Sequence, residues 1–246
     1  MSHPNRVGRK RAALAAALMS ATFCCALCAQ RLSDLTTPAP LPPGSTLVIG
    51  FLGGFESWDD GHRSVRQLAL RLRERPGVYA ESISNHQRNV ALELIQRALD
   101  TNRNQRIEPE ERNAARVILY GQSWGGAAAI DTARDLDRLG IPVLLTVQVD
   151  SVGRHDGVIP PNVRAAVNFY QHDLFTIQGR GQIRAADPAR TRVLGNFGAS
   201  YLLRSVDGTN ASWTRRVFGG SHAKMELDPV LWSQVEQYIS DAIAKR

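Results

Sequence analysis

The chain has 246 residues, of which 43% are hydrophobic and 22% charged, and these values are ordinary for one soluble globular domain. The formal net charge is +7, but four basic residues lie between Arg6 and Arg11, and without them the excess falls to +3. So small an excess gives no support for a nucleic-acid-binding function, and we expect no nucleic-acid partner.

The N-terminal segment has the pattern of an export signal. Basic residues between Arg6 and Arg11 precede an uncharged run from Ala12 to Ala29 that ends in small residues. We therefore expect residues 1–29 to be a signal peptide, which makes the protein periplasmic or secreted, with no stable membrane span after cleavage. The alternative is an uncleaved membrane anchor, for which the run is short. All three cysteines lie in this segment, so a cleaved chain would have no disulfide and no cysteine nucleophile.

Residues 30–45 contain the proline-rich stretch Thr-Thr-Pro-Ala-Pro-Leu-Pro-Pro-Gly, which predicts an extended linker before a domain of residues 46–246. Within the domain, short apolar runs alternate with amphipathic helical patterns. The expected strands are Thr46–Gly50, Val78–Ile83, Val117–Tyr120, Pro142–Val149, Arg164–Tyr170 and Trp213–Phe218. The expected helices are Val65–Leu72, Val90–Leu99, Ala127–Leu139 and Asp228 to about Ala244. Because several strands are apolar on both faces, the pattern predicts an α/β fold with a mostly parallel sheet and helices on both faces.

The strand Val117–Tyr120 and the helix after it are joined by Gly121-Gln122-Ser123-Trp124-Gly125, a G-x-S-x-G motif in strand–turn–helix context. Such a turn holds the serine in a strained backbone conformation, and the flanking glycines allow strand and helix to approach closely. The serine would stand at a helix N-terminus, where free N–H groups favour developing negative charge. Ser123 is therefore the candidate nucleophile.

Other candidate groups also follow expected strands, and in a parallel sheet such groups meet at the carboxyl edge. The loop Gly50–Gly54 follows the first strand, Asp150 follows Pro142–Val149, and His222 follows Trp213–Phe218. An oxyanion loop followed by Ser, Asp and His is the chain order of α/β-hydrolase triads. From about Thr46 to its C-terminus, the chain resembles a compact α/β-hydrolase of the esterase/lipase type.

This resemblance implies roles for individual residues. Gly50-Phe51-Leu52-Gly53-Gly54 is similar to the His-Gly-Phe-x-Gly oxyanion segment of the family, with Ile49 in place of the histidine, and implies that the N–H groups of Phe51 and Trp124 bind the oxyanion. His222 stands where the family places its base. Asp150-Ser151-Val152 resembles the Asp-Pro-(Ala/Val) that carries the acid in some lipases, whereas Asp173 follows the next strand, the commoner place. We favour Asp150 as the triad acid, with Asp173 as the alternative.

A second motif precedes the serine motif. The stretch from Asp100 to Glu111 is similar to the twelve-residue calcium loop of EF-hands, with oxygen-bearing side chains at its first, third, fifth, ninth and twelfth positions. The resemblance implies a structural calcium ion bound by Asp100, Asn102, Asn104, the Arg106 carbonyl and Glu111. Gln105 stands where the motif has glycine, and two arginines lie within the loop. The alternative is therefore a loop that keeps the turn without an ion.

Together these patterns predict an exported serine hydrolase that cleaves a carboxylic ester, with a small-molecule ester or a lipid as substrate and no cofactor required for catalysis. A thioesterase, an acyltransferase or a peptidase would use the same residues, and loops such as 154–161 and 175–200 would choose among substrates. The alternative that is not an enzyme is a binding protein with a hydrolase-like fold and no activity. The complete Ser–Asp–His order argues against this alternative. The sequence leaves the oligomeric state open.

Overall fold

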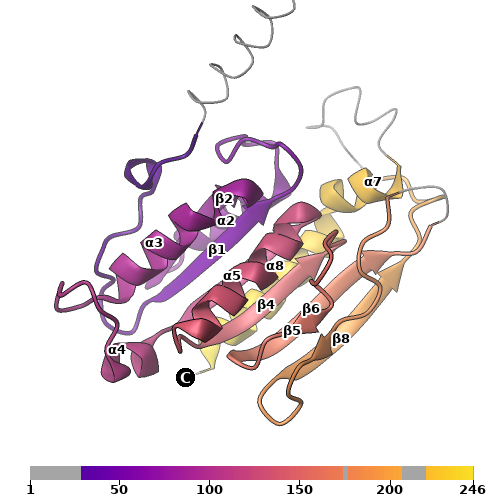
Figure 1. Cartoon of the computed structure of the whole chain (residues 1–246). Helices are drawn as coiled ribbons and strands as arrows, with labels where there is room; N and C mark the ends of the chain where they lie inside the picture. Colours follow the sequence, from indigo (N-terminus) through magenta and orange to yellow (C-terminus); the bar gives the residue numbers. More distant parts are fainter. Residues whose placement is uncertain (1–28, 174–176, 207–219, 246) are drawn as a thin grey trace, which may run out of the picture.

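The computed structural model of the chain describes residues 29–173, 177–206 and 220–245. A six-stranded sheet forms its centre, with the order β2-β1-β3-β4-β6-β8 and every neighbouring pair parallel (Figure 1). The strands are β1 (Thr46–Leu52), β2 (Val78–Ser84), β3 (Val117–Gln122), β4 (Val143–Val149), β6 (Val163–Gln171) and β8 (Arg192–Ala199). The predicted mostly parallel sheet is confirmed.

Helices cover both faces of the sheet, as predicted (Figure 1). One face packs against α3 (Arg88–Leu99) and α5 (Trp124–Arg138), and the other against α2 (Ser64–Arg73) and α8 (Pro229–Ala244). Within β1, Leu47, Ile49 and Phe51 face the first pair of helices, while Val48 and Leu52 face the second pair. Each such buried side chain contributes roughly 1.5–3 kcal/mol, which explains why this strand is apolar throughout.

Residues 30–45 pack onto the domain instead of forming an extended linker. Thr36 and Thr37 donate their N–H and hydroxyl groups to Oε1 of Glu81 over distances of 2.7–3.0 Å. Glu81 lies in β2, is almost fully buried and also pairs with Arg73. A buried carboxylate needs such donors, because burial without them is costly. The leucines of the segment also pack against the α3 and α5 side of the core.

The C-terminal part of the sheet differs from the prediction. Residues 175–200, expected to be a loop, contain the edge strand β8 and the short strand β7 (Arg184–Ala185), which pairs with β5 (Val158–Ile159) in a separate two-stranded sheet. Gly195 and Gly198 interrupt the apolar pattern of β8, so its sequence does not alternate like an ordinary strand. The expected strand Trp213–Phe218 lies outside the described residues.

No helix within residues 29–173, 177–206 or 220–245 is long and apolar enough to cross a bilayer. The predicted signal peptide lies outside the described residues, apart from its last position, Ala29.

Candidate active site

The turn between β3 and α5 has the geometry that the G-x-S-x-G motif predicts. Ser123 has φ 56° and ψ −126°, a backbone conformation that residues with a Cβ rarely adopt. A Cβ on Gly121 would lie 2.2 Å from the Gly125 carbonyl oxygen, and one on Gly125 would lie 2.0 Å from the Phe51 carbonyl oxygen. The two glycines are therefore required by the close approach of α5 to β3 and β1. Ser123 itself is held by its N–H, which donates to the Val149 carbonyl at 2.9 Å.

Three residues that are far apart in the sequence meet beside this turn. The Ser123 Oγ lies 3.0 Å from Nε2 of His222, and Nδ1 of His222 lies 2.6 Å from Oδ2 of Asp150. Asp150 directly follows β4, the neighbour of β3, and His222 lies in the first turn of α7 (Ser221–Leu227). The Asp150 side chain is fully buried, whereas that of His222 is 17% exposed. The structure thus places the predicted nucleophile, base and preferred acid in one continuous chain of contacts.

The Asp150 carboxylate is fixed by backbone donors. Its Oδ1 accepts the N–H of Gly179 at 2.9 Å and the N–H of Gln171 at 3.3 Å, which leaves Oδ2 directed at His222. Since an ionised carboxylate only accepts hydrogen bonds, His222 donates its Nδ1–H to Asp150, and its Nε2 is the acceptor for the Ser123 hydroxyl. Asp150 therefore selects the imidazole tautomer that a serine nucleophile needs.

Asp173, the alternative acid, has other partners. Its carboxylate accepts hydrogen bonds from the Ser200 hydroxyl, the Tyr201 N–H and the Ser221 hydroxyl. Burial raises the pKa of Asp173, but these three hydrogen bonds, together with the electrostatic attraction of His172, hold the pKa below its ordinary value. Because Ser221 precedes His222, Asp173 ties the end of β8 to the helix that carries the candidate base. The carboxylate against the His222 ring is that of Asp150.

The two predicted oxyanion donors, Phe51 and Trp124, differ in whether their N–H groups are free to bind an oxyanion. Phe51 lies inside β1, which runs through Leu52 and pairs with strands on both sides, and the N–H groups of such a central strand serve the sheet ladder. The first residue after the strand is Gly53, where a Cβ would lie 3.1 Å from Ser123 Cβ. Within the described part of the chain, the N–H groups of Gly53 and Trp124 have no hydrogen-bond partner. The candidate donor therefore moves from Phe51 to Gly53, while Trp124 keeps its place at the start of α5.

Gln122 is a site residue that the sequence pattern did not single out. Its side chain is buried, and its Nε2 lies 3.3 Å from Nε2 of His222, close to the Ser123 hydroxyl. The only sequence signal was its position inside the motif, immediately before the serine. Gln122 thus contacts the same imidazole nitrogen as the Ser123 hydroxyl.

Apolar side chains are exposed around the same edge of the sheet. Phe55 is 88% exposed and Trp124 is 43% exposed, and their rings pack edge to face with centroids 5.4 Å apart. Three more exposed apolar residues come from segments that follow β6 and β8, namely Ile177, Leu202 and Leu203. Groups of exposed apolar side chains mark binding surfaces more often than single exposed apolar residues do. Trp124 therefore contributes to an open apolar surface beside Ser123.

The loop predicted to bind calcium forms a turn closed by its own hydrogen bonds. Asp100 accepts the N–H groups of Asn104 and Gln105 at 3.0 and 2.7 Å, and Gln105 has φ 64°, the conformation that glycine normally supplies. Two further bonds of this kind are Asn104 N–H to Asn102 Oδ1 and Arg106 N–H to Asn104 Oδ1. Among the described residues, no group of three or more His, Cys, Asp or Glu is placed to hold a metal ion. Calcium binding by this loop stays a prediction.

Glu111, the last of the expected calcium ligands, caps helix α4 (Pro109–Ala114). Its carboxylate accepts the N–H and hydroxyl of Thr101, both at 2.7 Å, and the N–H of Glu108 at 2.9 Å. The hydrogen bond from the Glu108 N–H, followed by that from the Thr101 hydroxyl, lowers the pKa of Glu111. Its stabilising contribution is therefore present above the unfolded-state pKa of about 4.3 and is lost as the pH falls through the lower folded-state pKa.

Replacing this cap gives a prediction that does not depend on calcium. Glu111→Gln is expected to lower the free energy of unfolding by about 1 kcal/mol at pH 7, since helix caps contribute roughly this much. Thermal melting in excess chelator measures this effect alone, and equal melting temperatures for the two proteins would contradict it. Repeating the melt in calcium tests the ion, because a ligand bound only to the native state raises the melting temperature of the wild type and not that of the variant.

Comparison with known proteins gives structural neighbours only. No family model matches the chain, and no curated protein matches it. Its similar solved structures include a dienelactone hydrolase from Anabaena variabilis, at 14% identity and a TM-score of 0.40, with 82% of this chain and 87% of that chain covered. A cutinase-like protein from Cryptococcus sp. is 12% identical with a TM-score of 0.41, and 85% and 98% are covered. An α/β serine hydrolase without lid from Xanthomonas campestris is 11% identical with a TM-score of 0.36, and 85% and 91% are covered.

The chain's own features define its fold. The sheet is parallel, the strained serine turn joins β3 to α5 at its carboxyl edge, and Ser123, Asp150 and His222 follow one another in the chain. A nucleophile elbow at the top of such a sheet, with partners in the order Ser, Asp, His, defines the α/β-hydrolase arrangement. The chain therefore has a compact α/β-hydrolase fold.

Proposed function

We propose that this protein is an exported serine hydrolase that cleaves carboxylic esters through an acyl-enzyme. The observation that supports it most is the chain of contacts from Ser123 Oγ to His222 Nε2, at 3.0 Å, and from His222 Nδ1 to Asp150 Oδ2, at 2.6 Å. Both distances lie within the range of about 2.6–3.2 Å in which a nucleophile, its base and the orienting group act together. The strained turn places Ser123, which is 9% exposed, at the carboxyl edge of the sheet, beside the half-exposed ring of Trp124.

The first half of the reaction forms the acyl-enzyme. The Ser123 oxygen attacks the ester carbonyl carbon while His222 Nε2 takes the hydroxyl proton, and Asp150 stays ionised and holds the Nδ1–H of the imidazolium. The carbonyl oxygen gains the negative charge, which the N–H groups of Gly53 and Trp124 and the N-terminus of α5 stabilise. As the tetrahedral intermediate collapses, the bond to the alcohol oxygen breaks and His222 gives that oxygen its proton.

The second half releases the acid. Water replaces the alcohol beside His222, which removes a proton from the water as its oxygen attacks the acyl carbon. The same N–H groups stabilise the second tetrahedral intermediate, and the bond to Ser123 breaks as His222 returns the proton to the serine oxygen. Every step is carried by side chains and backbone groups of this chain, so no cofactor is required.

The exposed apolar surface beside Ser123 favours an ester with an apolar acyl chain. Phe55 and Trp124 pack against each other, and Trp124 directly follows Ser123, so the acyl group of a bound ester would extend over these two rings. Burying one aromatic ring against an acyl chain stabilises binding by roughly 1.5–3 kcal/mol. We therefore propose that medium-chain esters or lipids are the substrates, and that short-chain esters make fewer contacts.

Phe55→Ala tests this acyl surface. We expect the variant to raise the KM for p-nitrophenyl octanoate about tenfold, the effect of roughly 1.4 kcal/mol, and to leave the KM for p-nitrophenyl acetate within twofold. Steady-state kinetics with both esters measure the difference. Leu70→Ala on α2 is the matched control, because Leu70 is an exposed apolar residue away from the sheet edge. An equal change for the acetate and octanoate esters would contradict the assigned surface.

A substrate panel tests the class of reaction. We expect the protein to hydrolyse p-nitrophenyl esters faster than an acyl thioester of the same chain length and to leave a peptide p-nitroanilide intact. A faster thioester or anilide reaction would move the assignment to a thioesterase or a peptidase with the same residues. If nothing is hydrolysed and a fluorophosphonate does not label Ser123, the protein is a binding protein on a hydrolase scaffold.

A further inference from the structure

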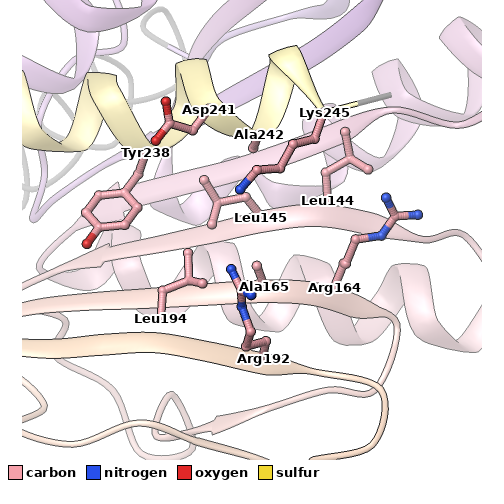
Figure 2. Close-up of a pocket in the computed structure, with 10 residues that line it drawn as sticks. All are labelled: Leu144, Leu145, Arg164, Ala165, Arg192, Leu194, Tyr238, Asp241, Ala242 and Lys245. Carbon is pink, nitrogen blue, oxygen red and sulfur yellow. The ribbon is translucent and has the colours of Figure 1, made fainter.

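A separate cavity of about 550 Å³ lies at the end of the sheet away from Ser123 (Figure 2). It is formed where β4, β6 and β8 begin and where α8 ends, whereas Asp150 and the serine turn lie where the strands finish. Its volume falls within the range of about 300–1,000 Å³ typical of small-molecule sites. Because it lies at the opposite end of the strands from Ser123, the cavity is not part of the active site.

The floor of this cavity is apolar. Leu145, Ala165 and Leu194 come from three neighbouring strands, and Ala242 comes from α8. Ala165, Leu194 and Ala242 are only partly buried, so the core cluster under α8 remains open on this side. Figure 2 shows these side chains gathered between the helix and the strands. A partly covered apolar face of this kind is suited to an alkyl or acyl chain.

The rim of the cavity is basic. Arg164, Arg192 and Lys245 are exposed, and within the described part of the chain their side chains have no ion pair or hydrogen bond. Among the described residues that line the cavity, Asp241 is the one acidic residue, and its carboxylate accepts a hydrogen bond from Gln237 at 2.7 Å. In Figure 2 the arginines extend from the strands, and Lys245 reaches toward the same cavity from the helix side. The described basic groups thus outnumber the described acidic ones by three to one and attract an anion.

We propose that this cavity binds a single amphiphilic carboxylate, with its chain on the apolar floor and its head between the basic side chains. Charge complementarity supports an anionic head, and a carboxylate can accept two hydrogen bonds from one guanidinium. The cavity is concave and bounded by α8 on one side, so it fits one chain better than the flat surface of a membrane. This site does not depend on the proposed ester hydrolysis.

The experiment is titration of the full-length protein with dodecanoate below its micelle concentration, followed by calorimetry. We expect one binding site, with Kd at least tenfold weaker in Arg164→Gln/Arg192→Gln and at least tenfold weaker for dodecyltrimethylammonium. Ala242→Trp, which fills the floor, is expected to weaken binding to the same extent without a change of charge. The matched control is Arg184→Gln/Arg190→Gln, which removes two exposed arginines that do not line the cavity and should leave Kd unchanged. Thermal melting checks that each variant is folded.

Several outcomes would overturn this site. One is that dodecanoate does not bind. Another is that the Arg164/Arg192 variant binds dodecanoate with the same Kd as the wild type. A third is that the wild type binds dodecyltrimethylammonium as tightly as dodecanoate. Binding removed by fluorophosphonate labelling of Ser123 would place the carboxylate at the active site instead. Arginine-dependent sedimentation with phosphatidylglycerol vesicles, without binding of the monomeric carboxylate, would identify a membrane surface as the partner. Ester turnover should be unchanged in the Arg164/Arg192 variant, so failure of this site leaves the proposed hydrolase activity untouched.

Discussion

Ser123→Ala is expected to lower kcat for p-nitrophenyl butyrate by about 10⁴- to 10⁶-fold, the loss that follows removal of a nucleophilic serine from a triad. The alanine cannot form an acyl-enzyme, while the N–H groups of Gly53 and Trp124 remain available to polarise the ester. The substitution removes one oxygen and keeps the Cβ, so the backbone of the turn has no reason to change. Initial rates of p-nitrophenol release, corrected for spontaneous hydrolysis, measure the effect.

Ser151→Ala is the matched control for this prediction. Ser151 is a buried serine next to Asp150, and its hydroxyl donates to Asp156 at 2.6 Å. We expect this variant to keep its turnover within about tenfold of the wild type. A fluorophosphonate should label the wild type and Ser151→Ala on the peptide that contains Ser123. Turnover or labelling that persists in Ser123→Ala would show that another residue is the nucleophile.

Much of the fold could be predicted because the buried strands differ from the helices in their apolar pattern. The strands β1, β3 and β4 are apolar on both faces, and each ends close to the predicted position. The edge strand β8 was not predicted, because an edge strand needs fewer apolar residues and Gly195 and Gly198 interrupt it. The docking of residues 30–45 could not be predicted either, since it depends on Glu81, whose burial becomes visible only when β2 is placed in the sheet.

The candidate site was predictable where chain order alone decides position. Ser123 and His222 were placed by a local motif and by their order along the chain. The sequence favoured Asp150 but left Asp173 as an alternative, because both residues follow parallel strands that end at the same edge of the sheet. The proposed oxyanion donor is Gly53, two residues after the predicted Phe51, because β1 continues through Leu52, and no sequence pattern marks the last residue of a buried strand.

The second large effect is expected for Asp150→Asn, which should lower kcat about 10⁴-fold with little change in KM. The asparagine keeps the size of the side chain, but it removes the charge that stabilises the imidazolium. Its amide can also donate to His222 Nδ1, and the imidazole then carries its proton on Nε2, where it cannot accept the Ser123 proton. Steady-state kinetics at pH 7–8 measure the loss, and circular dichroism shows whether the variant is folded.

Asp173→Asn is the matched control, because Asp173 is a buried carboxylate at the end of the neighbouring strand. We expect it to keep kcat within about tenfold and to lower the melting temperature, since Ser200, Ser221 and the Tyr201 N–H lose a charged acceptor. The pKa of Asp173 is lowered in the folded protein, so its contribution is present above the unfolded-state pKa of about 3.9 and is lost as the pH falls through the folded-state pKa. The difference in melting temperature from the wild type should therefore shrink below about pH 4. A 10⁴-fold loss of kcat in Asp173→Asn with Asp150→Asn active would instead make Asp173 the acid of the triad.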